Sequence, residues 1–391
     1  MKLKLTLAAM AGLAATSAPG ADAPASDGTA CTRAAVGAAA IGLRTARAAL
    51  MAVPPGDDDT LVDPAAGRRI EATKDRLRAF VGAMMDCAPT TVEPPALAAA
   101  MAQRAGTDDP EPGPAGRHGD RIAYQVSRVD GHPEMLAVVA TLGIHCGSDS
   151  MLMLYAREDR RWRELMVRRS EPYQKISGGW GDLRFAVSPP DAQGKWFVAT
   201  VSTTPWCTSA WQGMPYALAR PGPAPDRPSV FFRGKSTIYL GDESDLTVKA
   251  ERDAFELRHD GGSLDPDILI RRHVRRYSVA GESVRRVQPV AESVRDFVDE
   301  WVDSPWAEAK EWSRGDPALA AAHSALQAAR YKSLGGFASL RACRDGAAQV
   351  EIVGQDGPGW FLIVRGGASG PWTMARVARQ AIDGCSGPDR L

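Results

Sequence analysis

Residues 122–167 read IAYQVSRVDGHPEMLAVVATLGIHCGSDSMLMLYAREDRRWRELMV. This segment holds four runs of about strand length, which are residues 122–129, 135–142, 151–157 and 162–167. An Asp-Gly pair, a Gly-Ser pair and a charged turn separate them. Short runs rich in apolar residues between such turns are typical of antiparallel strands joined by hairpins. The segment therefore predicts a four-stranded antiparallel meander.

The same pattern of short apolar runs separated by turn residues occurs three more times further along the chain. A second set of runs comprises residues 183–187, 195–202, 215–219 and 230–240, the last of them broken by Gly234. The third set comprises 246–250, 254–259, 268–279 and 283–290, and the fourth comprises 338–343, 348–353, 360–364 and 372–377. We therefore expect a mainly β fold of modular antiparallel meanders. Two arrangements fit this pattern: a propeller-like set of sheets, and a large β-sandwich or barrel flanked by helices.

Helical patterns flank and interrupt the strands. Residues 31–51 and 68–87 carry apolar side chains at helical spacing on either side of a Pro-Pro-Gly-Asp break, which predicts an antiparallel N-terminal α-helical hairpin. The expected division of the chain is a signal peptide (1–25), a helical hairpin region (26–105), a linker (106–119), a β-rich body (120–290), a helical insertion (291–334) and a C-terminal β meander (335–391).

The six cysteines are expected to form three disulfides. Antiparallel packing of the hairpin brings its two ends together, so Cys31 is predicted to pair with Cys87. The remaining four are predicted to pair in sequence order, and these pairs are Cys146 with Cys207 and Cys343 with Cys385. The chain has no C-x-x-C motif and no Cys-His cluster with ligand spacing, so we expect no metal site.

The first residues of the chain have the pattern of an export signal. Lys2 and Lys4 precede an apolar run over residues 5–15, and residues 23–25 read Ala-Pro-Ala, the small-x-small pattern that a signal peptidase requires. Asn is absent while Ala, Gly, Arg and Pro are abundant, a bias that indicates a GC-rich bacterial genome. No later apolar stretch is expected to reach the roughly 20 residues of a membrane helix. We therefore predict a periplasmic or secreted protein with no transmembrane segment once the signal is removed.

Charge and motifs exclude several classes of function. Forty-seven basic residues balance forty-seven acidic ones, so no overall field attracts nucleic acid, and no nucleic-acid partner is expected. The chain lacks H-E-x-x-H, G-x-S-x-G, S-x-x-K, P-loop and dinucleotide-binding motifs. We accordingly expect no cofactor, assign no catalytic residue, and favour a binding role over catalysis.

Aromatic residues are densest between residues 180 and 216. Aromatic faces that project from loops can stack on sugar rings or on peptide side chains. Trp206 and Trp211 lie in turn-rich sequence beside Cys207, which makes them candidate ligand-binding residues. Packing of the same rings in the core is the alternative.

A second candidate lies in the basic run over residues 268–279. Alternation places Arg271, His273 and Arg275 on one face of a strand, where guanidinium forks could clamp carboxylate or phosphate groups. The alternative is a structural face that is paired with acidic residues, and those nearby in sequence are Asp242, Glu243 and Asp245.

Together these features predict an exported, non-catalytic binding or accessory protein of the bacterial envelope. Its expected partner is an envelope protein or polymer. The competing class is a secreted hydrolase that acts on cell-wall or polysaccharide substrates, for which two carboxylates would have to converge in a cleft.

Overall fold

The computed structural model describes residues 31–385 apart from 55–59, 108–116, 242–245, 265–268, 288–290, 292, 314–315, 331–333, 355–358 and 368–369. The predicted signal peptide (1–25) and most of the predicted linker lie outside these residues, as do Asp242, Glu243 and Asp245.

The N-terminal region is helical, as predicted. Helix α1 (Arg33–Met51) begins where the Thr32 hydroxyl accepts a hydrogen bond from the Ala35 N–H. Helix α2 (Pro64–Cys87) begins at an Asp63 cap followed by proline, and α3 (Pro94–Ala105) ends at Gly106, whose φ of 68° suits glycine. α1 and α2 pack against each other, and a disulfide joins Cys31 to Cys87.

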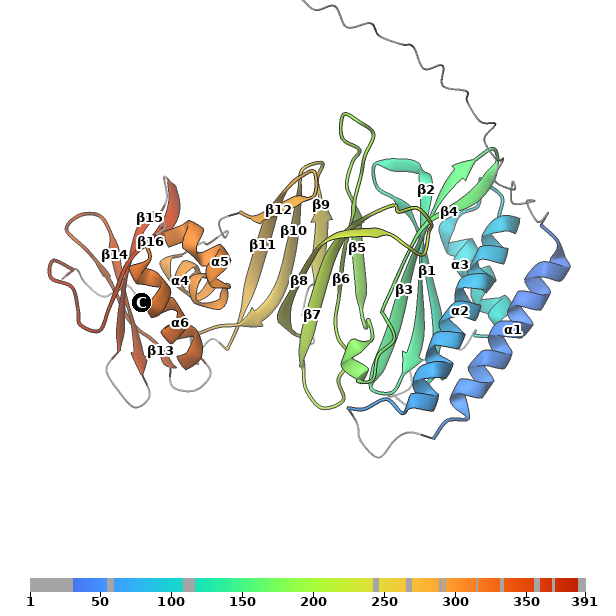
Figure 1. The fold of residues 1–391 in the computed structure, drawn as a ribbon, viewed down its shortest axis with the longest axis horizontal. Helices are drawn as coiled ribbons and strands as arrows, with labels where there is room; N and C mark the ends of the chain where they lie inside the picture. Colours follow the sequence, from blue (N-terminus) through green and yellow to red (C-terminus); the bar gives the residue numbers. More distant parts are fainter. Residues whose placement is uncertain are drawn as a thin grey trace, which may run out of the picture.

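Within the described residues, sixteen strands form four separate antiparallel sheets of four (Figure 1). Each sheet is a simple meander in which chain order equals spatial order, so the predicted modular meanders are confirmed. The first sheet contains β1 (Ile122–Val129), β2 (His132–Ile144), β3 (Gly147–Glu158) and β4 (Arg161–Arg169). The second contains β5 (Leu183–Val187), β6 (Val198–Ser202), β7 (Trp211–Arg220) and β8 (Ser229–Tyr239). The third contains β9 (Thr247–Ala250), β10 (Ala254–Gly262), β11 (Ile270–Ala280) and β12 (Ser283–Arg286). The fourth contains β13 (Leu334–Ala342), β14 (Ala348–Gly354), β15 (Trp360–Gly367) and β16 (Gly370–Ala378).

The sheets and helices follow one another along the long axis of the molecule (Figure 1). One core lies between α1–α3 and the first sheet, a second between the first and second sheets, and a third between the second and third sheets. The helices α4 (Val294–Asp303), α5 (Trp306–Ala309) and α6 (Ala318–Ala329) share a further core with the fourth sheet. These helices separate the third sheet from the fourth, so the sheets form an open row and not a closed ring.

Strand β8 differs from its expected form at Gly234. The sequence predicts a break there, but β8 runs continuously through this glycine. The Tyr216 ring of β7 lies over it, and a Cβ at residue 234 would be 2.3 Å from the Cε2 atom of that ring. The glycine therefore makes room for an aromatic ring on the neighbouring strand.

The disulfides and the first helix fit an exported protein. All six cysteines are paired, in the sequential arrangement predicted. One helix, α1, is long and apolar enough to cross a membrane when judged by length and composition alone, contrary to the expectation that no stretch after the signal reaches this length. Side chains of α1 such as Val36, Leu43 and Leu50 are nevertheless buried in the core that the helices share with the first sheet.

Candidate functional site

An open groove lies between the first three sheets. Its volume is about 970 Å³, and the first strand of each sheet lines it: β1, β5 and β9. Each of these strands stands at the edge of its own sheet and has one strand partner, which is β2, β6 and β10 respectively. Three sheet edges therefore meet at one open groove.

Strand β5 turns backbone hydrogen-bonding groups toward this groove. The Ser188 N–H donates to the Phe197 carbonyl at 2.9 Å, which fixes the phase of the β5–β6 ladder. In an antiparallel edge strand, every second residue points its N–H and C=O away from the partner strand. By this alternation, the backbone groups of Phe185 and Val187 face the open edge, and both residues line the groove.

Strand β9 presents a second open edge. The Glu251 N–H donates to the Ala254 carbonyl at 2.7 Å and fixes the phase of the β9–β10 ladder. The backbone groups of Val248 and Ala250 consequently point away from β10, and both residues line the groove. Unpaired edges of this kind are templates for pairing with another chain.

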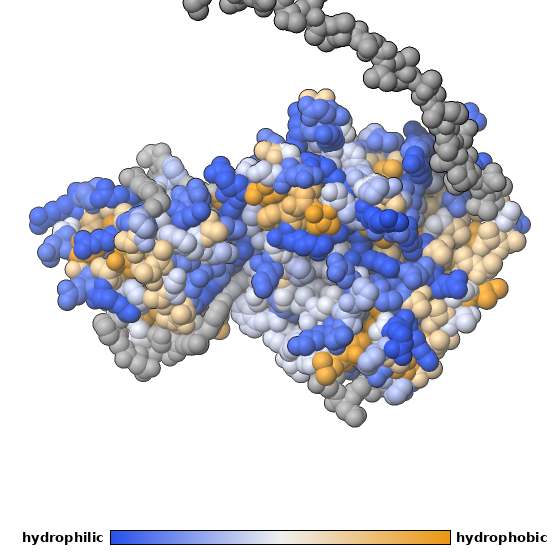
Figure 2. Space-filling view, in the orientation of Figure 1, coloured by the Kyte–Doolittle hydropathy of each residue, from blue (hydrophilic) through white to orange (hydrophobic). Residues whose placement is uncertain are grey.

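The groove has an apolar floor and a charged rim. Leu183, Val187 and Leu246 are buried and line it. Acidic and basic side chains alternate at the rim without an excess of either sign, and these are Arg128, Asp130, Asp182, Arg184, Lys249 and Glu251. Figure 2 likewise shows apolar patches interspersed among polar residues on the viewed face, with no single continuous apolar surface.

The predicted tryptophans lie outside this groove. Trp206 and Trp211 are each 38% exposed. Trp211 packs beside Tyr239, with 5.1 Å between ring centroids, and the outer edge of its ring lies about 3.7 Å from the Cβ position of Gly262. Their proposed role in ligand binding stays a prediction, but neither ring lines any of the hollows described below.

Arg271, His273 and Arg275 share one face of β11, as the alternation predicted. That face is covered by α4 and carries a buried ion network. Arg271 Nε lies 2.8 Å from Asp299 Oδ2, and Arg275 Nη2 lies 2.8 Å from Asp303 Oδ2. The acidic partners of Arg271 and Arg275 lie 28 residues further along the chain, in α4, so both arginines bind another part of the same protein.

Glu300 is the centre of this network. Its carboxylate accepts hydrogen bonds from His273 Nδ1 at 2.9 Å, Arg271 Nη2 at 3.0 Å and Arg286 Nη2 at 2.7 Å. Burial opposes ionisation, but Arg286, His273 and Arg275 outweigh it and hold the pKa of Glu300 well below its usual range. The network therefore explains these basic residues as structural connections between the third sheet and α4.

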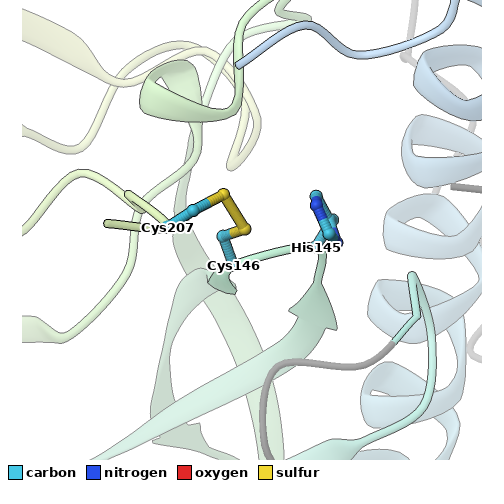
Figure 3. Close-up of side chains that lie close together, drawn as sticks. All are labelled: His145, Cys146 and Cys207. Atoms are coloured by element: carbon cyan, nitrogen blue, oxygen red, sulfur yellow. A yellow bond between two sulfur atoms is a disulfide. The ribbon is translucent and has the colours of Figure 1, made fainter. Parts of the chain in front are cut away.

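A histidine and two cysteines meet at the turn between β2 and β3. The nearest ligand atoms of His145, Cys146 and Cys207 lie within 4.8 Å of one another (Figure 3). His145 and Cys146 form the turn itself. Cys146 and Cys207 are joined in a disulfide, so neither sulfur is available as a thiolate, and the imidazole alone could act as a metal ligand in this state.

Three carboxylates line a shallow hollow of about 460 Å³ between α2 and the first sheet, and these are Asp75, Asp86 and Glu164. Glu164 is held by Arg78, with 2.7 Å between Nη2 and Oε2, and it accepts a longer hydrogen bond from the Tyr155 hydroxyl at 3.4 Å. Partial burial, together with the charge of Glu164, raises the pKa of Asp86. Trp162 completes one wall. Asp86 and Glu164 therefore form a pair of carboxylates in different surroundings.

The groove was missed by sequence reasoning. Its edges come from strands that lie about 60 residues apart in sequence, and no local sequence motif predicts that these strands lie side by side. No protein-family model matches the chain, and no curated protein matches it significantly in sequence. Function must therefore be argued from the geometry of the chain itself.

Proposed function

We propose that the chain is a non-enzymatic binding protein of the bacterial periplasm that holds an extended segment of a partner protein in the groove between β1, β5 and β9. The observation that carries this proposal is the convergence of three open sheet edges on one large hollow. An extended polypeptide can satisfy such an edge through main-chain hydrogen bonds, while its alternate side chains contact the apolar floor.

The lining favours a polypeptide over a polysaccharide. Sugar rings are commonly bound by stacking on Trp or Tyr faces, and neither residue type lines the described part of the groove. A polyanion is also disfavoured, because the rim carries as many acidic as basic side chains. A polypeptide that is neutral or carries charges of both signs matches the absence of Trp and Tyr from the described lining and the balanced charge of the rim.

The test uses random decapeptides displayed on phage and selected against the purified, oxidised protein. A photo-crosslinking residue in place of Lys249, which is exposed at the rim, should capture the selected peptides, whereas one in place of Arg163 on β4 should not. Equal capture at both positions, or none at Lys249, would contradict the proposal.

The backbone role is tested at Ala250. Ala250→Pro removes an N–H that points toward the groove and leaves the β9–β10 ladder in place. Ala250→Ser is the matched control because it retains the N–H. The proline variant should bind the selected peptides at least fivefold more weakly than the serine variant, about the loss of one hydrogen bond. Unchanged binding would show that the peptide does not pair with this edge.

A hydrolase acting on cell-wall polymers is the second candidate, and the Asp86–Glu164 hollow favours it. In this reading Asp86 is the general acid and Glu164 the second carboxylate. Release of reducing ends from peptidoglycan should then be lost in Asp86→Asn and retained in Asp75→Asn, a control in the same hollow. Absence of release by the unmodified protein would remove this candidate.

A further inference from the structure

A small cavity between the first and second sheets contains a buried arginine that forms no ion pair with a described carboxylate. Its volume is about 180 Å³, and Arg168 of β4 enters it from the first sheet. Thr200, Ser202 and Tyr216 line it from the second sheet, and Trp180 lines it from the segment that precedes β5. The site is distinct from the groove, although Leu183 borders both.

Arg168 is the unusual residue of this cavity. Its side chain is 94% buried, since only 6% of the residue surface is exposed. The Nε and Nη2 atoms have no hydrogen-bond partner, and no carboxylate among the described residues forms an ion pair with it. Its described contact is with the face of Trp180, with 5.3 Å between Cζ and the ring centroid. A buried guanidinium left in this state is costly unless a ligand completes it.

A second arginine stands at the rim of the same cavity. Arg233 is largely exposed and lies 3.6 Å from Glu171, measured between Nη2 and Oε1. Burial, together with the charge of Arg233, lowers the pKa of Arg168 to about 10. The negative charge of Glu171 partly offsets this lowering, and Arg168 remains a cation at neutral pH.

We propose that this cavity binds the carboxylate group of a small ligand, with the Arg168 guanidinium as its main partner. A planar guanidinium offers two parallel N–H donors that match the two oxygens of a carboxylate. The Ser202 hydroxyl lies in the same wall and can donate to the same group, whereas the Thr200 hydroxyl donates to the Ala217 carbonyl at 3.4 Å. The inference is independent of the proposed groove function, because no step in it requires a peptide in the groove.

Size and lining narrow the ligand further. A volume of about 180 Å³ corresponds to about six water molecules at roughly 30 Å³ each. The remaining walls are apolar, formed by Leu183, Pro215 and Ala217 with the Tyr216 ring. A monocarboxylate with a short apolar body fits this space better than phosphate, which requires more donors around it. The carboxyl end of a polypeptide offers the same chemistry as a free acid.

The experiment measures binding of benzoate and isovalerate to the full oxidised chain by calorimetry and thermal melting. Both should bind and raise the melting temperature, whereas benzamide, the neutral analogue of benzoate, and inorganic phosphate should do neither. Tripeptides with free and with amidated carboxyl ends test whether the carboxylate belongs to a small free acid or to the end of a polypeptide. Binding of the free-ended peptide alone would assign the site to a chain terminus, and binding of the small acids alone would assign it to a metabolite-sized ligand.

Two substitutions at Arg168 decide whether the residue serves binding or structure. Arg168→Met should weaken benzoate binding at least tenfold, and Arg168→Lys should weaken it less because it retains the charge but not the fork. Without ligand, Arg168→Met should melt at the same temperature as the unmodified protein or higher, since it removes a buried unpaired charge. Arg163→Met, an exposed arginine of the same strand, is the matched control.

Three outcomes would overturn the inference. The first is that no carboxylate binds the unmodified protein, and the second is that phosphate or benzamide binds as well as benzoate. The third is that Arg168→Met melts at a lower temperature and binds benzoate with unchanged affinity, because Arg168 would then serve packing alone. The Arg168→Lys variant gives the same answer if the methionine variant does not fold.

Discussion

At the residue scale, Lys74 shows how a charge is accommodated in the core. It lies in α2 with 1% exposure. Its Nζ atom donates to the Ser170 carbonyl at 3.0 Å and hydroxyl at 2.7 Å, and lies 3.2 Å from Asp149 Oδ2. These contacts join the helical hairpin to the first sheet.

We predict that Lys74→Met lowers the free energy of unfolding by about 3–5 kcal/mol, because it leaves the buried Asp149 carboxylate without its cation. Urea denaturation followed by circular dichroism measures this change. The double variant Lys74→Met, Asp149→Asn should lose less than the sum of the two single variants. A loss below about 1 kcal/mol for Lys74→Met would show that the pair contributes little.

At the scale of elements, the helical hairpin depends on its own disulfide. Cys31 and Cys87 are 56 residues apart in sequence. Closing a loop of this length stabilises a protein by about 4 kcal/mol in the chain-entropy model. The bridge joins the start of α1 to the end of α2, so its loss should loosen these helices first.

We therefore predict that the double variant Cys31→Ser, Cys87→Ser lowers the melting temperature and increases hydrogen exchange in α1. The matched control is Cys343→Ser, Cys385→Ser, which should leave exchange in α1 unchanged because its loop lies in the fourth sheet region. Equal α1 exchange in both variants would refute a local role for the first bridge.

At the scale of the whole molecule, two different kinds of contact join successive sheets and helices along the long axis. Apolar side chains join the first three sheets, whereas the Glu300 network joins the third sheet to α4. Buried ionic contacts of this kind lose their stability sharply when one partner is removed. The C-terminal part should therefore separate from the rest more readily than the first three sheets separate from each other.

We predict that Glu300→Gln splits thermal unfolding into two transitions in differential scanning calorimetry. The substitution leaves Arg271 and Arg286 with one fewer carboxylate partner in a buried setting, at a cost of about 3–5 kcal/mol. Glu311→Gln, at an acidic residue of the same helical region, is the control and should unfold like the original protein. A single, unshifted transition in Glu300→Gln would contradict the prediction.

Acid should destabilise the molecule as a whole. Burial, with His273 and Arg275 nearby, lowers the pKa of His259 well below its usual value. Unfolded histidine takes up a proton near pH 6.5 while buried His259 does not, so stability present above about pH 6.5 is lost as the pH falls below it. Glu300, whose pKa is lowered, loses its contribution only at more acidic pH, below about 4.5.

The measurement is the free energy of unfolding between pH 7.5 and 5.0. In His259→Gln, the free energy of unfolding should fall less steeply as the pH is lowered, by up to about 1.4 kcal/mol per pH unit, which is the slope that one proton gives. A variant with an exposed acidic group removed, Glu158→Gln, should keep the original slope over this range. An identical slope in His259→Gln would show that His259 does not carry the effect.

The amino-acid sequence by itself determined the strands, the helical hairpin and the disulfide pairing. β1 and β5 have the predicted bounds, 122–129 and 183–187, because turn residues and apolar runs are local signals. Cys31 meets Cys87 because two helices joined by a short break pack antiparallel. Period-two alternation predicted that Arg271, His273 and Arg275 share one face of a strand. It did not predict that this face is buried.

Only the tertiary structure decided what those elements do together. The groove exists because β1, β5 and β9 stand at the edges of three sheets that pack face to face, and the unpaired Arg168 exists because two of those sheets enclose it. The acidic partners of β11 come from α4, which no local pattern connects to that strand. Contacts between distant segments depend on how the faces of sheets and helices pack against each other. A local pattern of neighbouring residues does not predict that packing.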